Sequence, residues 1–270
     1  MTLKPKYRAA VVQNMPLYDT EKSISAASQL VAEAAATADI VILPEMFTTP
    51  YELTLMNTAA RFTSAALKEL CCIAKQNSSF ICSGSMPVRR STKLTNTSYL
   101  IDRSGKLIYE YNKCHLFDVK LPQLTVSESK IFTAGDSIKT VETLLGKIGI
   151  AICYDIRFPE LTRKMTLAGM QLLCLPAAFS ETTGKAHWHT TMRARAIENQ
   201  IYICVASPAR NDKSSYPAYG HSMIISPWGE IIAEADCGQE IIYGEINPAT
   251  IDKIRQQLPL LKHRRAKLYQ

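Results

Sequence analysis

The sequence has no apolar run close to the roughly 18 residues that a transmembrane helix needs, so we expect no membrane-spanning segment. A long apolar stretch is also missing around Lys4 and Lys6, and we expect no secretory signal there. The eight cysteines include no Cys-x-x-Cys pair, which excludes the common zinc-finger spacing. Because Cys82, Cys174 and Cys204 stand inside apolar segments, we interpret them as small buried side chains and expect a reduced, cytoplasmic protein.

Low-complexity linkers and short-period repeats are absent too, which favours one continuous domain. With 270 residues, 47% hydrophobic and 20% charged, the chain can bury a sizeable core. We predict a single domain over residues 1–270, in which residues 258–270 form a C-terminal tail. The formal net charge is +7, and Lys262–Lys267 (KHRRAK) carries part of the excess. We interpret this run as a solvated terminus and expect neither nucleic acid nor a membrane as partner.

The spacing of apolar residues predicts strands that alternate with helices. Strands are predicted at Tyr7–Gln13, Ile40–Leu43, Phe80–Ser85, Ile148–Ile152, Leu172–Leu175, Ile201–Ala206 and Glu240–Ile246. Helices are predicted from Asp19 to Thr37, at Ala60–Gln76, Lys185–Asn199 and Pro248–Gln257, and from Pro159 onward. Two hairpins turn at Asp102–Gly105 and Ser226–Gly229, and the polar stretch Asp118–Asp136 is predicted to be a long loop. This pattern is typical of an α/β domain with mixed sheets.

The stretch Gly146–Leu161 (GKIGIAICYDIRFPEL) places a cysteine at the end of a predicted buried strand. The apolar run stops at Cys153, and Pro159 stands where a helix can begin. A helix N-terminus with free N–H groups favours a thiolate, and strand ends are where open α/β sheets bind ligands. Cys153 is therefore a candidate nucleophile that requires a base and a positive charge nearby.

Two other predicted strands end on residues that could meet these requirements. Glu45 follows the strand IVIL, and Lys113 follows the hairpin strand LIYEY. A carboxylate can take the proton of a thiol, and burial would raise the pKa of Glu45 toward a value suited to this task. The Lys113 ammonium and the backbone N–H of Tyr154 could together hold the oxyanion of a tetrahedral intermediate.

Each of these residues also has an alternative interpretation in which it has no catalytic role. Glu45 could be a loop carboxylate, Lys113 a surface lysine, and Cys153 a buried structural cysteine. His115 is a second candidate for the base, as in Cys–His chemistry, because it stands two residues after Lys113.

Three motifs resemble the nitrilase, or carbon–nitrogen hydrolase, superfamily. They are LPEMF (43–47), YNKCHLF (111–117) and CYDIRFPEL (153–161). The resemblance extends from about Tyr7 to Tyr269. It implies a four-layer αββα sandwich whose subunits pair into a homodimer.

The resemblance also implies roles for four side chains. Glu45 corresponds to the general base, Lys113 to the group that stabilises the intermediate, and Cys153 to the nucleophile. A second glutamate that often lies near the lysine corresponds to Glu128, in VSESK. The alternative for Glu128 is an exposed loop carboxylate. No metal and no organic cofactor are expected, because the chemistry needs only these side chains and water.

Within the superfamily, further stretches resemble the omega-amidase branch: 126–136, 186–202, 207–230 and 254–259. That branch hydrolyses the terminal amide of 2-oxoglutaramate and 2-oxosuccinamate, which gives the 2-oxo dicarboxylate and ammonia. The expected partner is thus a small-molecule amide. Alternatives are an amidase for deaminated glutathione, a true nitrilase, or a catalytically silent interaction module.

A 2-oxo acid substrate carries a carboxylate, so the pocket needs a cation. Arg157, four residues after Cys153, is the candidate, because guanidinium pairs bidentately with carboxylate. The competing interpretation is a structural salt bridge. His187 and His189 do not form a convincing metal pair, because residues i and i+2 point to different sides of a helix.

Overall fold

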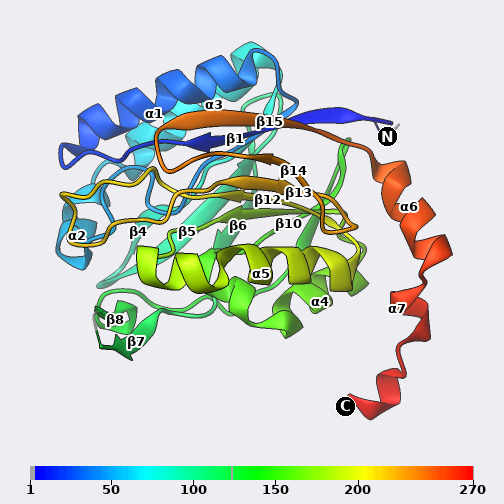
Figure 1. The fold of residues 1–270 in the computed structure, drawn as a ribbon. Coiled ribbons are helices and arrows are strands. Elements are labelled where there is room, and N and C mark those ends of the chain that lie inside the picture. The colour runs from blue at the N-terminus through cyan, green and yellow to red at the C-terminus, as the bar shows by residue number, and fades with distance from the viewer. Residues whose placement is uncertain (1–3, 123, 270) are drawn as a thin grey trace.

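The computed structural model describes residues 4–122 and 124–269 of the chain. Two β-sheets lie face to face in the middle of the described part, and helices cover both outer sides (Figure 1). The result is the four-layer α/β sandwich that the family resemblance implies.

Seven strands form the first sheet: β1 (Tyr7–Gln13), β2 (Ile40–Ile42), β3 (Phe80–Cys82), β4 (Met86–Arg90), β5 (Lys93–Ile101), β6 (Leu107–Asn112) and β15 (Glu240–Ile246). They lie in the order β15-β1-β2-β3-β5-β4, and β6 pairs with β5. The central strands β1, β2 and β3 run parallel to one another. Their carboxyl ends therefore lie at one edge of the sheet.

Six strands form the second sheet: β9 (Thr140–Thr143), β10 (Gly146–Ile150), β11 (Leu172–Pro176), β12 (Tyr202–Ala206), β13 (Met223–Ile225) and β14 (Ile231–Glu234). Their order is β14-β13-β12-β11-β10-β9, with β10, β11 and β12 parallel. A separate hairpin consists of β7 (Asp118–Leu121) and β8 (Leu124–Ser127).

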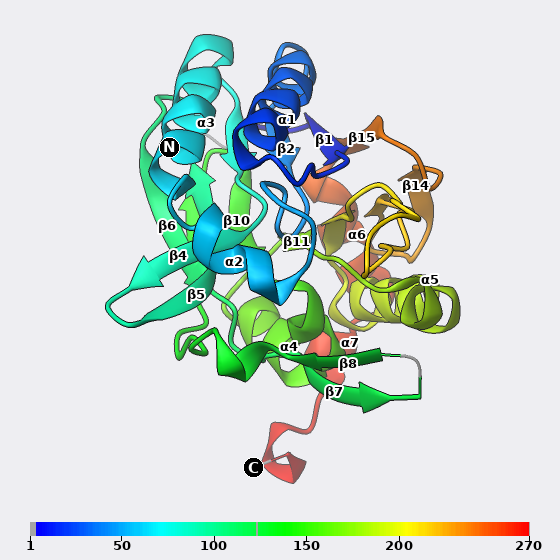
Figure 2. The ribbon, with the colours of Figure 1, turned by 90° about the vertical axis from the view of Figure 1, so that its left-hand side faces the viewer.

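The helices are α1 (Thr20–Ala35), α2 (Met56–Ala59), α3 (Thr63–Asn77), α4 (Pro159–Leu167), α5 (Glu181–Asn199), α6 (Pro248–Gln257) and α7 (Leu260–His263). Short 3₁₀ turns occupy Leu53–Leu55, Glu128–Lys130, Cys153–Arg157 and Ala266–Leu268. Helices α1 and α3 cover the first sheet, and α4 and α5 cover the second (Figure 2). Helices α6 and α7 lead away from the sandwich toward the C-terminus (Figure 1). No described helix combines the length and apolar character that a membrane crossing requires.

Strand β2 illustrates how the apolar pattern builds the layers. Ile40 and Ile42 face the core between the two sheets, and Val41 faces the core beneath α1 and α3. Successive side chains of a strand point to opposite faces, so a strand buried on both sides has no polar position. Full burial of each such side chain contributes about 1.5–3 kcal/mol. The short run IVIL therefore fixes the position of the residues that follow it.

Several predicted elements are confirmed with the same bounds, namely Tyr7–Gln13, Glu240–Ile246 and Pro248–Gln257. Asp19 caps α1 as predicted, because its carboxylate accepts a hydrogen bond from the backbone N–H of Lys22. The prediction of a long loop over Asp118–Asp136 is wrong, since this stretch contains the β7–β8 hairpin and a 3₁₀ turn.

Strand β4 was not predicted from the sequence, because Pro87 and two arginines interrupt its apolar pattern. It lies at the end of the first sheet, where a strand can accommodate proline.

Candidate active site

Two carboxylates and one ammonium form a cluster in the interior of the protein. The Nζ atom of Lys113 lies 2.9 Å from Oε1 of Glu45 and 2.9 Å from Oε2 of Glu128. All three side chains are 0% exposed. Ionised groups are costly to bury unless they are paired, so the cluster depends on each of its members.

The ends of two strands in the first sheet position Glu45 and Lys113. Glu45 follows β2 after Leu43 and Pro44, and its Oε1 also accepts a hydrogen bond of 2.8 Å from the Asn96 side chain. Lys113 follows β6, and its backbone N–H donates to the carbonyl of Asn96 at 2.9 Å. Asn96 on β5 thus joins both residues, a role that nothing in the sequence indicated.

Glu128 lies at the start of the 3₁₀ turn after β8. Its Oε1 accepts from the Tyr51 hydroxyl and its Oε2 from the backbone N–H of Phe117, each at 2.6 Å. The alternative of an exposed loop carboxylate is therefore wrong. The β7–β8 hairpin carries Glu128 into the interior, where Val126 packs in one apolar cluster with Tyr51.

Burial and the charges of the cluster together raise the pKa values of Glu45 and Lys113. Burial raises the pKa of Glu45 above its usual value of 4.5, although Lys113 opposes this effect. Burial alone would lower the pKa of Lys113, but the charges of Glu128 and Glu45 outweigh it and hold that pKa well above 10.5. Lys113 is thus a permanent cation, whereas Glu45 is a carboxylate with increased affinity for a proton.

Cys153 lies at the end of β10, where the chain bends sharply. Its φ is +47°, in the left-handed region that few residues other than glycine adopt. Its Sγ accepts a hydrogen bond of 3.4 Å from the backbone N–H of Ala178, and its side chain belongs to the core between the sheets. Strained backbone of this kind is concentrated at functional sites, and here it holds the thiol at the cavity wall.

The predicted preference for a thiolate at Cys153 is wrong for the unliganded protein. Burial, followed by the charge of Glu45, raises the pKa of the Cys153 thiol well above 9.0. Helix α4 begins only at Pro159, after the 3₁₀ turn, so it does not start at the thiol. The group is therefore a thiol at rest. The Oε2 atom of Glu45 accepts no hydrogen bond from the described residues and is free to take its proton.

Asp155 connects the 3₁₀ turn that begins at Cys153 to the segment around Lys113. This role was not predicted from the sequence. This fully buried carboxylate accepts from the backbone N–H of Ile152 at 3.0 Å and from the Tyr111 hydroxyl at 2.7 Å. It also accepts from the backbone N–H of His115 at 2.9 Å. An acidic residue in the first turn after a strand is a common cap, and this signal could have identified Asp155.

A small pocket, with a cavity volume of about 10 Å³, lies next to the thiol. Its walls are mostly apolar or aromatic and comprise Tyr51, Phe117, Cys153, Tyr154, Arg157, Ala178, Phe179, Thr183 and Tyr216. The rings of Tyr51 and Tyr216 lie 4.7 Å apart between centroids. A lining of this kind, apolar with a few polar groups, is typical of sites that bind small molecules.

Arg157 contributes the cation of this cavity. Its guanidinium lies 4.5 Å above the Phe179 ring, and its Nη1 lies 3.2 Å from Nδ1 of His187. The alternative of a structural salt bridge is wrong, because no described carboxylate lies within ion-pair distance of Arg157. Its positive charge therefore remains available to an anionic ligand.

The remaining residues that the sequence singled out are His115, Tyr154, His187 and His189. His115 directs Nδ1 to Asp155 at 2.7 Å and stacks on Phe158, so it does not serve the thiol as a base. Tyr154 is the second residue of its 3₁₀ turn, where backbone N–H groups lack partners within the turn. His187 and His189 diverge as predicted, His187 toward Arg157 and His189 toward another part of the surface.

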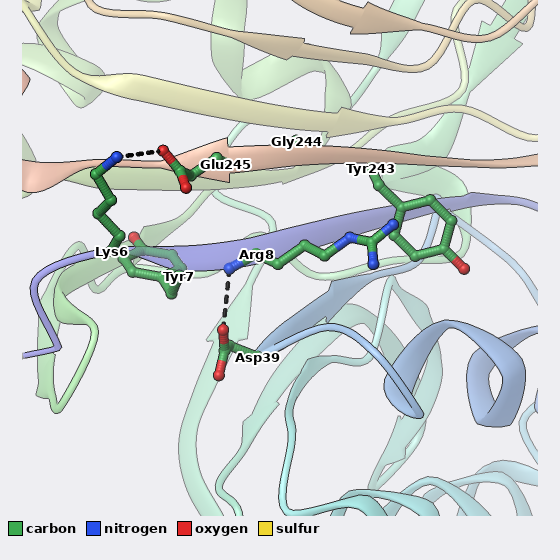
Figure 3. A pocket seen from close by; sticks show the side chains of 7 residues that line it. All are labelled: Lys6, Tyr7, Arg8, Asp39, Tyr243, Gly244 and Glu245. Carbon is green, nitrogen blue, oxygen red and sulfur yellow. Dashed lines mark hydrogen bonds and ion pairs between the residues drawn. The ribbon is translucent and has the colours of Figure 1, made fainter.

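A larger surface hollow, of about 420 Å³, lies outside this region, along β1 and β15 (Figure 3). Lys6 pairs there with Glu245 at 2.9 Å, and the Arg8 guanidinium lies 4.1 Å from the centre of the Tyr243 ring. None of the residues predicted to be catalytic lines it. The cavity at Cys153 is thus the better candidate for the active site.

Comparisons with known proteins agree with this arrangement. A family model described as carbon–nitrogen hydrolase matches residues 8–256. The omega-amidase NIT2 of Mus musculus is 41% identical over 266 residues, which cover 97% of this chain and 96% of the relative. The crystal structure of Nit3 of Saccharomyces cerevisiae, a member of branch 10 of the nitrilase superfamily, superposes with a TM-score of 0.89. It is 36% identical and matches 97% of this chain and 98% of its own.

The C. elegans NitFhit protein has a TM-score of 0.93 at 33% identity, and the match covers all of this chain and 67% of that one. The matched family defines the class of this protein, the hydrolases of carbon–nitrogen bonds. The chain belongs to the carbon–nitrogen hydrolase family, in the Nit2-type group of the nitrilase superfamily. It is a hydrolase that acts on amides.

Proposed function

We propose that this protein is an omega-amidase that hydrolyses the terminal amide of 2-oxoglutaramate and 2-oxosuccinamate, with Cys153 as nucleophile. One observation carries the proposal. The cavity that exposes the Cys153 thiol also holds the guanidinium of Arg157, which no described carboxylate neutralises. A short amide with a carboxylate at its other end would match both groups.

The first half of the proposed reaction forms a thioester. Glu45 accepts the proton of the Cys153 thiol, and the thiolate attacks the amide carbon. The Lys113 ammonium and the Tyr154 N–H hold the negative oxygen of the tetrahedral intermediate, and each such donor stabilises it by roughly 3–4 kcal/mol. The carbon–nitrogen bond then breaks, and ammonia leaves with the proton returned by Glu45.

The second half releases the acid. Glu45 removes a proton from water, the hydroxide attacks the thioester carbon, and the Cys153 sulfur leaves as the thiol. Glu128 contributes by holding Lys113, because its oxygens already accept hydrogen bonds from Tyr51 and from the Phe117 backbone. These contacts keep the Lys113 ammonium in one position during both halves of the reaction.

The role of Arg157 predicts a specific change in substrate preference. Replacing Arg157 by alanine should raise the KM for 2-oxoglutaramate by about 10- to 100-fold, because charge-assisted hydrogen bonds contribute roughly 1.5–3 kcal/mol. The KM for a neutral amide of similar length should change little. Steady-state kinetics with both substrates provide the measurement, and Arg157→Lys is the control that keeps the charge. Equal effects on the two substrates would remove the proposed carboxylate contact.

The raised pKa of Glu45 predicts a pH dependence. As the pH falls through that pKa, Glu45 gains a proton and can no longer accept the one from Cys153, so kcat/KM should fall. Because burial places this pKa above 4.5, the acid limb should have an apparent pKa above that value. The measurement is kcat/KM for 2-oxoglutaramate at a series of pH values, with circular dichroism to verify folding. Full activity down to pH 4.5 would contradict the assignment of Glu45 as base.

An ammonia-release assay distinguishes the proposal from its alternatives within the family. We expect the highest kcat/KM for 2-oxoglutaramate, against deaminated glutathione, glutamine and a simple nitrile. A preference for deaminated glutathione would overturn the substrate assignment and leave the reaction class intact. Release of ammonia from none of them would favour the silent interaction module.

We also propose a single domain over residues 1–270 that forms a homodimer in the cytoplasm. Apolar residues stand exposed on α4, on α5 and in the tail, as Leu167, Ile197 and Leu268 do, with exposures of 55%, 40% and 62%. A second copy of the chain could cover them. All eight cysteines are free, which supports a reducing compartment. Sedimentation velocity would test the dimer.

A further inference from the structure

We infer that His189, His221 and Glu234 form a site for a divalent transition-metal ion, of which zinc is the best probe. The three residues come from α5, from the loop before β13 and from the end of β14. The Nε2 atom of His189 lies 2.7 Å from Oε1 of Glu234, and the Nδ1 atom of His221 lies 3.2 Å from the same oxygen. All three ligand atoms lie within 4.8 Å of one another.

The charge of Glu234 supports a cation at this position. Its carboxylate is flanked by two imidazoles, and within residues 4–122 and 124–269 it forms no ion pair with a lysine or arginine. The carboxylate therefore faces two nitrogen ligands rather than a permanent cation. A metal ion between the three side chains would balance the charge of the carboxylate and would replace the two N–H donors by metal–nitrogen bonds.

The separations of Glu234 from the two histidines are close to what zinc requires. With metal–nitrogen and metal–oxygen bonds of about 2.0–2.2 Å, tetrahedral ligands stand about 3.3 Å apart. The two imidazole nitrogens lie within 4.8 Å of each other, so rotation of these side chains would bring all three ligand atoms to this spacing. The side chains of His189, His221 and Glu234 are 37%, 24% and 30% exposed. Water can therefore reach the site and supply a fourth ligand.

The backbone around His221 is already fixed before a metal binds. His221 has a φ of +56° and follows Gly220, whose φ is +77°, so two successive residues adopt the left-handed conformation. The carbonyl of His221 accepts a hydrogen bond of 2.7 Å from Nε1 of the buried Trp188. The ring of Tyr219 lies 4.4 Å from that of His221. A ligand fixed in this way loses little freedom when a metal binds.

The metal would act on the structure rather than on the reaction. None of the three residues lines the cavity at Cys153. A bound ion would tie α5 to the β13–β14 hairpin at the edge of the second sheet. Binding to the folded state alone raises the temperature of unfolding by mass action.

Zinc titration of the Cys153→Ala variant tests this site. The variant removes the active-site thiol as a competing ligand, because thiolates are strong zinc ligands. Calorimetry should show one ion bound per chain with micromolar affinity, and the unfolding temperature should rise with zinc. His189→Ala and Glu234→Gln, each added to Cys153→Ala, should weaken binding at least tenfold and abolish that rise. The matched control His263→Ala removes an exposed histidine of α7 and should change neither result.

Cobalt provides an independent readout of the ligands. Cobalt bound to the same protein should absorb in the visible region without a thiolate charge-transfer band. Failure of Cys153→Ala to bind zinc below about millimolar concentration would overturn the site. Undiminished binding by His189→Ala or by Glu234→Gln would overturn it as well.

Discussion

Replacing Cys153 by alanine should abolish ammonia release from every amide that the protein hydrolyses, with kcat reduced by about 10⁴-fold or more. Alanine has no nucleophilic atom, and the described groups around the cavity offer no second thiol. The variant should still fold, with a modest loss of stability, because only one buried sulfur atom is removed. Activity and thermal unfolding measured on the same preparation test both statements.

A matched control separates the chemistry of Cys153 from the loss of a buried sulfur atom. Cys174 lies on β11 and is fully buried in the same core, but it is outside the cavity lining. Cys174→Ala should cost some stability and leave kcat within a few-fold of the wild type. Activity of Cys153→Ala above about one hundredth of the wild type would exclude Cys153 as nucleophile. An equal loss in Cys174→Ala would exclude it too.

Replacing Lys113 by methionine should remove activity and also destabilise the protein by about 3–5 kcal/mol. The loss leaves Glu45 and Glu128 buried, ionised and without their cation, and breaking one side of a buried ion pair has a cost of this size. Urea denaturation measures the change in the free energy of unfolding. Wild-type stability of Lys113→Met would show that the three charges do not depend on one another.

A second variant distinguishes the two roles of Lys113. Adding Glu128→Gln to Lys113→Met removes one of the uncompensated charges, so part of the lost stability should return. Activity should remain absent, because the ammonium that holds the oxyanion is still missing. Return of activity together with stability would mean that Lys113 acts only as a structural ion.

The fold could be predicted from the sequence where each element carries its own signal. Strand β1 alternates between two buried faces, and Asp19 and Pro248 mark helix starts by local chemistry. Strand β4 and the β7–β8 hairpin lack such signals. Proline breaks the pattern of β4, and the β7–β8 hairpin contains few apolar residues, so pairing with the neighbouring strand decides their structure.

The same limit applies to the site. Glu45, Lys113 and Cys153 could be proposed because each follows a readable strand, but the burial of Glu128 depends on contacts with Tyr51 and Phe117. The pKa of Cys153 depends on the depth of burial, which a helix-dipole argument does not include. The cluster of His189, His221 and Glu234 joins α5 to the β13–β14 hairpin, and no motif connects them.

The acyl-enzyme on Cys153 is the central claim, and trapping by hydroxylamine tests it most directly. Succinamate is the suitable substrate, because it has no oxo group with which hydroxylamine could react. If a thioester forms, hydroxylamine and water compete for it, so the hydroxamate should appear at the expense of succinate while ammonia release does not fall. Cys153→Ala should give neither product. Undiminished succinate with no hydroxamate at any hydroxylamine concentration would indicate direct attack by water and would contradict the mechanism.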